Sequence, residues 1–149
     1  MTVGEICNRD VVVAPKDEMI VDAAKRMRTS HVGDLVVVEG RGDHIPIGIV
    51  TDRDIVISVV AGDPDHVNYL LVSDVMSTDL VTAQEHDSIE TALEQMHEHG
   101  VRRLPIVSAT GTLIGILTLD DVLRYLTAQQ SELVALVARE QQHERQHRI

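Results

Sequence analysis

Apolar and polar positions follow one order twice along the chain. Each time, a short apolar run typical of a strand precedes apolar residues at i, i+3, i+4 and i+7, the spacing of a helix that buries one face. Two more apolar runs then flank a glycine-containing turn, which predicts a hairpin. The helix positions are Ile20, Ala23, Ala24 and Met27, then Ile89, Ala92, Leu93 and Met96; the strand runs are 11–13, 35–38 and 47–50, then 80–81, 104–107 and 113–117. Each half is therefore predicted to fold as β-α-β-β-α, with its last helix starting at Thr51 or Thr118.

The two halves also match each other position by position, as an internal repeat does. Residues 10–38 correspond to residues 79–107 at a spacing of 69, and beyond the hairpin turn the spacing falls to 67. The missing two residues belong to the loop between these strands, which contains 40–43 in the first copy and 109–111 in the second. Length changes concentrate in such surface loops, so the pattern indicates a duplication.

Four segments follow from this repeat. They are a first copy at 3–62, a linker at 63–71, a second copy at 72–128, and a C-terminal helical extension with a polar tail at 129–149. A three-stranded unit of this size buries too little surface to be stable alone, so the two copies are expected to pack against each other. The predicted fold class is α/β, more narrowly α+β.

Composition and charge narrow the class of protein. The chain has 149 residues, no Trp, no Phe, two Tyr and a formal net charge of −11. We therefore expect an aliphatic core, and we expect no general nucleic-acid binding, which requires a basic surface. No apolar run approaches the ~18 residues of a membrane span, and no signal peptide follows Met1. The single cysteine, Cys7, excludes an internal disulfide and corresponds to the apolar Met76 in the repeat. A cytoplasmic protein without membrane association is expected.

A polar pair recurs at the start of each last helix. Residues 48–54 read Gly-Ile-Val-Thr-Asp-Arg-Asp, and residues 115–121 read Gly-Ile-Leu-Thr-Leu-Asp-Asp. The Thr-x-x-Asp spacing is that of a capping box, which stabilises a helix start and need bind nothing. The same hydroxyl, carboxylate and free N–H groups are also suited to docking a phosphate or a sugar. The pattern alone leaves both interpretations open.

The duplicated context resembles a known family. Two β-α-β-β-α copies that each end in Gly-h-h-Thr-x-x-Asp, where h is apolar, look like a pair of cystathionine-β-synthase-type (CBS) domains. The run Val-Ser-Asp-Val-Met-Ser at 72–77 is similar to the family's lead-in to a second copy, and 101–107 is similar to its second strand. The resemblance covers 3–128 and implies two halves stacked through their sheets about a pseudo-twofold axis, with two clefts between them and frequent disc-shaped dimers.

The resemblance also implies a ligand and site residues. CBS pairs bind adenine nucleotides (AMP, ADP or ATP, sometimes NAD or S-adenosylmethionine) as allosteric signals, without catalysis. The carried-over positions are Asp54 and Asp121 for the ribose, Thr51 and Thr118 for the phosphate, and Val13-Ala14 or Thr82-Ala83 with Ile49 or Ile116 for the adenine.

The two implied sites differ in charge. Arg102 and Arg103 of the second copy correspond to Gly33 and Asp34 of the first, and Arg53 corresponds to Asp120. If the halves stack as in the family, Arg53, Arg102 and Arg103 would gather at Asp121. Asp54 would instead face Asp120, with Arg102 as the one cation that could still reach it. We therefore expect tighter binding at Thr118 and Asp121. The alternative is that these arginines are solvated or paired on the surface.

Two functional classes are retained. The first is a nucleotide-sensing regulatory module, a homodimer that acts on a separate protein. The second is a dimerising scaffold with no nucleotide. An enzyme finds little support, because the sequence has no positioned Ser–His or Cys–His pair and no Walker-type loop.

The C-terminal segment carries two further patterns. His143-Glu144-Arg145-Gln146-His147 fits the zinc-protease motif H-E-x-x-H, but it lies in the polar tail with no obvious third ligand, so no metal site is expected. An apolar patch at helical spacing precedes it: Leu133, Val134, Leu136 and Val137. It predicts either a prolonged helix that packs against a second chain or partner, or a helix that folds back onto its own domain.

Overall fold

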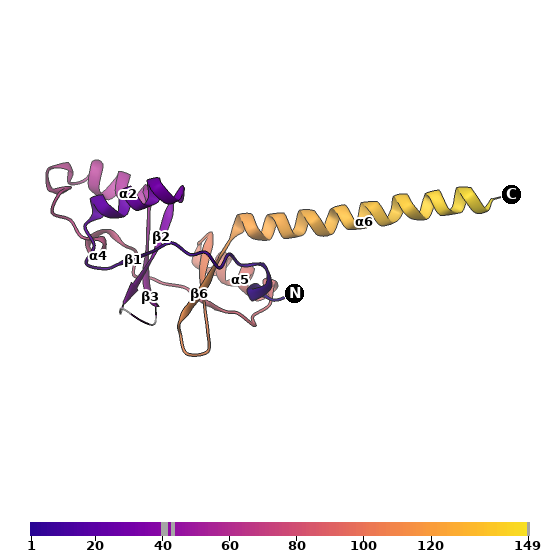
Figure 1. Cartoon of the computed structure of the whole chain (residues 1–149), viewed down its shortest axis with the longest axis horizontal. Helices are drawn as coiled ribbons and strands as arrows, with labels where there is room; N and C mark the ends of the chain where they lie inside the picture. Colours follow the sequence, from indigo (N-terminus) through magenta and orange to yellow (C-terminus); the bar gives the residue numbers. More distant parts are fainter. Residues whose placement is uncertain (40–41, 43, 149) are drawn as a thin grey trace.

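Two three-stranded sheets, one from each half, form the centre of the protein (Figure 1). The structure is a computed structural model that describes residues 1–39, 42 and 44–148. Of the predicted first-copy turn at 40–43, Gly40, Arg41 and Asp43 lie outside the described residues.

The first sheet has the order β1-β2-β3, in which β1 runs parallel to β2 and β2 runs antiparallel to β3. The second sheet repeats this arrangement as β4-β5-β6. The bounds are β1 Val13–Pro15, α2 Ile20–Ser30, β2 Asp34–Glu39 and β3 Ile45–Thr51, then β4 Ala83–Gln84, α5 Ile89–His99, β5 Arg103–Val107 and β6 Leu113–Thr118. The predicted β-α-β-β order is confirmed in both halves.

The last helices of the two halves differ. In the first half, α3 (Asp52–Asp54) runs into the π-helix η1 (Ile55–Val60), whereas in the second half α6 is one helix from Leu119 to His147. Thr51 and Thr118 are the residues immediately before these helices, as expected.

The predicted helix stripes face the core. Ile20, Ala23 and Met27 of α2 are buried, and so are their counterparts Ile89, Ala92 and Met96 of α5. The first strands, by contrast, begin about two residues later than predicted. The runs 11–13 and 80–81 mainly precede the strands, because the parallel pairing starts only at Val13 and Ala83.

The short helices before each repeat are exchanged between the halves. Val3 of α1 (Val3–Ile6) is buried in the core of the second half, and Val72 of α4 (Val72–Val75) is buried in the core of the first. Backbone hydrogen bonds fix both: Asn8 exchanges two with Ile116, and Ser77 exchanges two with Ile49. Each half therefore completes its core with the segment that precedes the other half.

The sheets meet through a small apolar cluster. Val36 and Val38 of β2 are buried against Ile116 of β6, and Val11, Val13 and Leu113 pack on them. The amide of Leu113 also donates to the carbonyl of His44 at 2.7 Å. The expected sheet-to-sheet packing is confirmed.

The region expected to be a linker is partly structured. It contains the 3₁₀ helix η2 (Pro64–His66), and Leu70 accepts a hydrogen bond from the amide of Ile20 at 2.8 Å. Val67 and Leu70 pack against the core of the first half. This segment therefore belongs to the first half as much as it connects the two.

Helix α6 leaves the body and projects away from it (Figure 1). Val122 is buried and Tyr125 packs on the second-half core, but every residue from Leu126 to Arg148 is exposed. Of the two predictions for Leu133–Val137, the prolonged helix is confirmed and the folded-back helix is wrong. Among the described residues, no helix combines the length and hydropathy needed to cross a membrane.

Candidate functional site

The two Thr-x-x-Asp motifs form the same cap. The amide of Thr51 donates to Oδ2 of Asp54 at 2.9 Å, and the amide of Asp54 donates to Oγ1 of Thr51 at 3.1 Å. Thr118 and Asp121 repeat this exchange at 2.9 and 3.2 Å. The capping interpretation therefore holds for both motifs, since a hydroxyl and a carboxylate satisfy free N–H groups at each helix start.

The two carboxylates differ in what else they contact. Oδ2 of Asp121 also accepts from the Thr118 hydroxyl at 2.8 Å, and its Oδ1 lies 3.4 Å from a guanidinium nitrogen of Arg124. Oδ1 of Asp54 has no hydrogen-bond partner in the part of the chain that the structure describes. Of the two carboxylates, Asp54 is thus the one with an oxygen free to accept a further hydrogen bond.

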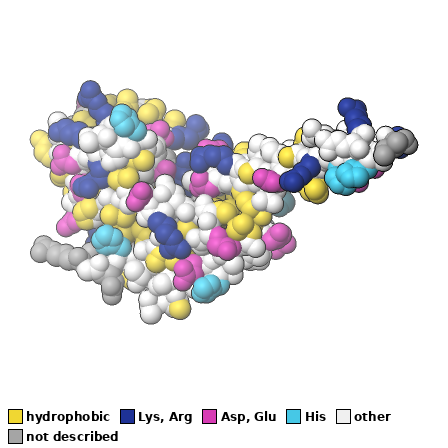
Figure 2. Space-filling view, turned by 45° about the vertical axis from the view of Figure 1, so that its right-hand side comes forward, with side chains coloured by type: hydrophobic (Ala, Val, Ile, Leu, Met, Phe, Trp, Pro, Cys, Tyr) yellow, Lys and Arg dark blue, Asp and Glu magenta, His cyan; other side chains and the backbone are white. Residues whose placement is uncertain are grey.

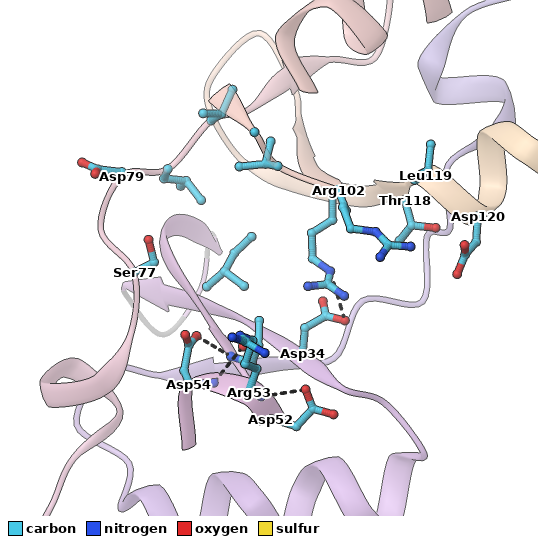
Figure 3. Close-up of a pocket in the computed structure, with 17 residues that line it drawn as sticks. Asp34, Asp52, Arg53, Asp54, Ser77, Asp79, Arg102, Thr118, Leu119 and Asp120 are labelled. Carbon is cyan, nitrogen blue, oxygen red and sulfur yellow. Dashed lines mark hydrogen bonds and ion pairs between the residues drawn. The ribbon is translucent and has the colours of Figure 1, made fainter. Parts of the chain in front are cut away.

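A cavity of about 690 Å³ lies beside Asp54, between the two halves (Figure 3). Figure 3 shows Asp34, Asp52, Arg53 and Asp54 on one side, with Arg102 and Thr118 facing them from the other half. The lining is Asp34, Ile49, Thr51, Asp52, Arg53, Asp54, Ser77, Asp79, Leu80, Val81, Gly100, Val101, Arg102, Arg103, Thr118, Leu119 and Asp120. The volume falls within the usual range of small-molecule sites.

The local chain order explains how these groups converge. Thr51 ends β3 and Asp54 sits in the turn of helix that follows, so both face the sheet edge. Arg103 begins β5 and pairs in register with Thr118 at the end of β6, which brings Arg102 and Thr118 to the corresponding edge of the second sheet. The sheets stack, and these two edges therefore bound one cavity.

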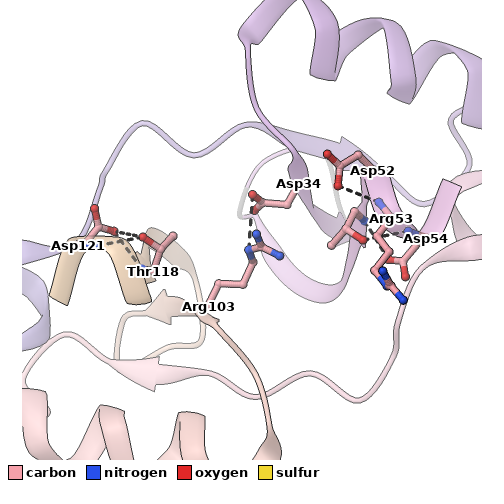
Figure 4. Close-up of polar contacts among 8 residues, drawn as sticks. Asp34, Asp52, Arg53, Asp54, Arg103, Thr118 and Asp121 are labelled. Atoms are coloured by element: carbon pink, nitrogen blue, oxygen red, sulfur yellow. Dashed lines mark hydrogen bonds and ion pairs between the residues drawn. The ribbon is translucent and has the colours of Figure 1, made fainter. Parts of the chain in front are cut away.

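An ion pair between the halves crosses this region (Figure 4). Nε of Arg103 lies 3.6 Å from Oδ1 of Asp34, and Figure 4 shows the pair between the two Thr-x-x-Asp motifs. Burial raises the pKa of Asp34; the Arg103 charge opposes this shift, and the nearby Asp52 carboxylate adds to it. Nε of Arg103 is buried without a hydrogen-bond partner among the described residues, so part of this guanidinium remains unsatisfied.

The structure places the three arginines at a different motif from the one expected. Arg53, Arg102 and Arg103 all line the cavity beside Asp54, and Asp121 is not part of that lining. The expectation that they gather at Asp121 is therefore wrong. The physical reason is that Arg102 immediately precedes β5 and Arg103 begins it, and this end of β5 faces the first half across the stacked sheets.

Only some of the residues expected to contact adenine line the cavity. Ile49 lines the cavity, whereas its counterpart Ile116 is only 7% exposed and packs with Val13 in the cluster between the sheets. Thr82 is half-buried and lies outside the lining, which its neighbour Val81 joins.

Sequence reasoning missed one wall of the cavity. Ser77, Asp79, Leu80 and Val81 line it because the segment after α4 runs along β3 of the first half. Helical or strand periodicity carries no signal for this, since the segment is extended and irregular.

The tail histidines lie on exposed α6. The rings of His143 and His147 stack with their centroids 4.2 Å apart, and Nδ1 of His147 lies 2.9 Å from the carbonyl oxygen of His143. Across the described residues, no group of three or more His, Cys, Asp or Glu side chains is arranged to hold a metal ion.

Comparison with known sequences gives consistent matches. A family model, described as CBS domain, matches residues 3–61 and 72–128. The CBS domain-containing protein YhcV of Bacillus subtilis (strain 168) is 36% identical over 121 residues, which are 81% of this chain and 82% of the relative. Inosine-5'-monophosphate dehydrogenase of Methanocaldococcus jannaschii is 38% identical over 120 residues, or 80% of this chain, but the match spans only 22% of that enzyme.

Solved structures share the fold. The crystal structure of CBSX2 in complex with AMP has a TM-score of 0.73 and 25% sequence identity, covering 87% of this chain and 98% of that one. CBSX2 is a CBS-pair protein from Arabidopsis thaliana.

Proposed function

The chain belongs to the CBS domain family, and on that premise we propose that it binds an adenine nucleotide beside Thr51 and Asp54 and passes this signal to a separate protein. The observation that carries the proposal is the cavity of about 690 Å³ that joins this motif to three arginines and an apolar wall. The AMP complex of CBSX2, a structure of the same fold, supports the ligand class.

The cavity offers a suitable side chain for the ribose, the phosphate and the base of a nucleotide. Oδ1 of Asp54, which lacks a partner among the described residues, is free to accept hydrogen bonds from ribose hydroxyls. Arg53 and Arg102 are exposed and charged in the cavity, so they suit a phosphate. Ile49 and Val81 supply apolar surface for the base.

Charge favours a monophosphate. The lining contains five carboxylates and three guanidinium groups, and Arg103 is already engaged by Asp34. Each phosphate beyond the first adds negative charge to a lining that is already net negative, at separations where screening is incomplete. We therefore propose that AMP binds more tightly than ADP, and ADP more tightly than ATP.

The second motif is proposed as the weaker site. Thr118 lines the cavity from its far side, whereas the carboxylate of Asp121 is occupied by Thr118 and Arg124. A ligand there has to displace these contacts before it can bind.

The regulatory step is the coupling of ligand to the packing of the two halves. Because the cavity is lined by both halves, a bound nucleotide contacts both and favours the packing that fits it best. We propose that a homodimer transmits this change to its target without catalysing a reaction.

Isothermal titration with AMP tests the site. Asp54→Ala should weaken AMP binding by about tenfold or more, because charge-assisted hydrogen bonds are lost. Asp121→Ala is the matched control: it removes the same capping contacts but should change affinity less than about threefold. An Asp121→Ala loss equal to or greater than that of Asp54→Ala would refute this assignment.

A thermal-shift screen with AMP, ADP, ATP, NAD and S-adenosylmethionine tests the function itself. A ligand that binds only the folded state must raise the melting temperature. The absence of a shift with all five would favour the scaffold alternative and overturn the proposal.

A further inference from the structure

The projecting part of α6 exposes apolar side chains that its own chain does not cover. Leu126 is 49% exposed, and Leu133, Val134, Leu136 and Val137 are between 52% and 65% exposed. Figure 2 shows hydrophobic side chains along this arm, outside the body of the protein. The family match ends at residue 128, so most of this surface lies beyond the CBS repeats.

These side chains follow the spacing of a coiled coil. Leu123, Leu126, Gln130, Leu133 and Val137 are separated alternately by three and four residues, which places them on one stripe of the helix. We call these five residues the α6 seam. In heptad terms Leu126 and Leu133 occupy d positions, and the other three occupy a positions.

Charge along the helix indicates what covers the seam. Between Tyr125 and Ala138 the only charged side chain is Glu132, which lies off the seam. Glu140 and Glu144 continue the heptad at d and a, so the apolar stripe ends at Val137. An uncharged, apolar seam offers no attraction to a charged partner, but it is complementary to a second copy of itself.

We propose that the α6 seam pairs with the same seam of a second copy, forming a short parallel two-stranded coiled coil. Gln130 sets the orientation. In a parallel pair, Gln130 meets Gln130 and the two amides can hydrogen-bond to each other, whereas an antiparallel pair places Gln130 against Leu133, which leaves the amide unsatisfied. This inference does not depend on nucleotide binding.

The interface is small. A buried leucine or valine removes on the order of 100 Å² of apolar surface from water. The four apolar seam residues with Val134 and Leu136, each roughly half to two-thirds exposed, would bury on the order of 700 Å² over both copies. Stable complexes usually bury at least ~1,200 Å², so the coiled coil alone should dissociate in the micromolar range or above.

Sedimentation velocity of the full chain over a range of concentrations tests the pairing. Leu133→Gln with Val137→Gln should weaken self-association at least about tenfold. Both residues are exposed in the single chain, so these substitutions should leave the monomer folded. Ala128→Gln with Ala135→Gln, on the opposite face of α6, is the matched control and should change association less than about twofold. An unchanged association constant in the seam variant would show that any dimer is held by the CBS repeats alone and would overturn the proposal.

Disulfide trapping tests the orientation. In a Cys7→Ser background, Gln130→Cys should form an intermolecular disulfide under mild oxidation at least about tenfold faster than Ala135→Cys, which lies outside the seam. Equal rates would rule out parallel pairing. Gln130→Leu should strengthen association, because a buried polar pair costs stability; a weaker association would also contradict the proposal.

Discussion

Gly48 and Gly115 let the exchanged segments lie directly against the sheets, and an alanine at either position should disturb a different part of the protein. A Cβ on Gly48 would lie 2.7 Å from the carbonyl oxygen of Ser77 and 2.9 Å from the sulfur of Met76. A Cβ on Gly115 would lie 2.7 Å from the sulfur of Cys7 and 3.0 Å from the carbonyl oxygen of Asn8. All four distances are too short for van der Waals contact, so a segment must move in each variant.

The expected cost follows from overpacking. Inserting a methyl group into a closed contact costs about 1–3 kcal/mol, and the lower entropy of the unfolded alanine chain returns about 0.4–1 kcal/mol. For a domain of this size, each kcal/mol lowers the melting temperature by about 2–4 °C. The net cost is at most about 2.6 kcal/mol, so Gly48→Ala and Gly115→Ala should lower the melting temperature by up to roughly 10 °C. The loss should be larger for Gly48→Ala because its nearest obstacle is backbone.

The two glycine variants should differ in their effect on AMP binding. Ser77 lines the cavity beside Asp54, so moving it in Gly48→Ala should also weaken AMP binding at the proposed site, whereas Gly115→Ala moves Cys7 and should not. Differential scanning calorimetry and titration measure both effects, and Gly42→Ala, with open space around its Cβ, serves as control.

A double variant tests the cause. Cys7→Ala removes the sulfur that obstructs Gly115→Ala, so the two substitutions together should cost less than the sum of each alone. Additive losses, or a Gly115→Ala protein as stable as the parent, would refute the close-contact explanation.

Three further predictions concern single side chains. Burial raises the pKa of Asp34, so ionising this carboxyl opposes folding. The contribution of the neutral carboxyl to the free energy of unfolding is complete below the unfolded pKa near 3.8. It is lost as the pH rises through the higher pKa of the folded state. Asp34→Asn should therefore raise the melting temperature at pH 7 by at most a few degrees, with the gain vanishing below about pH 4 in scanning calorimetry; a gain that persists there would contradict this sign. Burial also raises the pKa of the Cys7 thiol, so iodoacetamide at pH 8 should alkylate the folded protein several-fold more slowly than the protein in urea, as followed by mass spectrometry. Thr118→Ala removes a cap and should cost about 0.5–2 kcal/mol in urea denaturation, whereas Thr118→Ser should retain most of the stability.

The sequence predicted the elements whose signal is local. The spacing of Ile20 to Met27 and of Ile89 to Met96 predicted two helices with the correct buried faces, and the matched turns predicted both hairpins. The first strands were placed about two residues early because apolar residues also occur where the chain is extended but unpaired, as at Val81.

The placement of the site depended on long-range packing, which periodicity does not report. Thr51 and Asp54 were identified from their spacing, but the side of the interface that Arg102 faces depends on how the two sheets stack. The exchange of α1 and α4 between the halves was likewise not visible, because each short segment carries only a few apolar residues and could pack on either core.

The ion pair between Asp34 and Arg103 explains why the surroundings of the two Thr-x-x-Asp motifs differ. These residues occupy equivalent positions of the repeat, yet they contact each other. This repeat position therefore lies at the interface, where each half presents the same position to the other. Two aspartates or two arginines there would bring like charges together in a half-buried site, which is unfavourable. A stable contact at this point therefore requires the copies to differ. Once they differ, arginine side chains of the second half face Asp54, while the first half offers Asp121 no matching cation at these positions. The difference in charge around Asp54 and Asp121 is thus a consequence of how the halves pack.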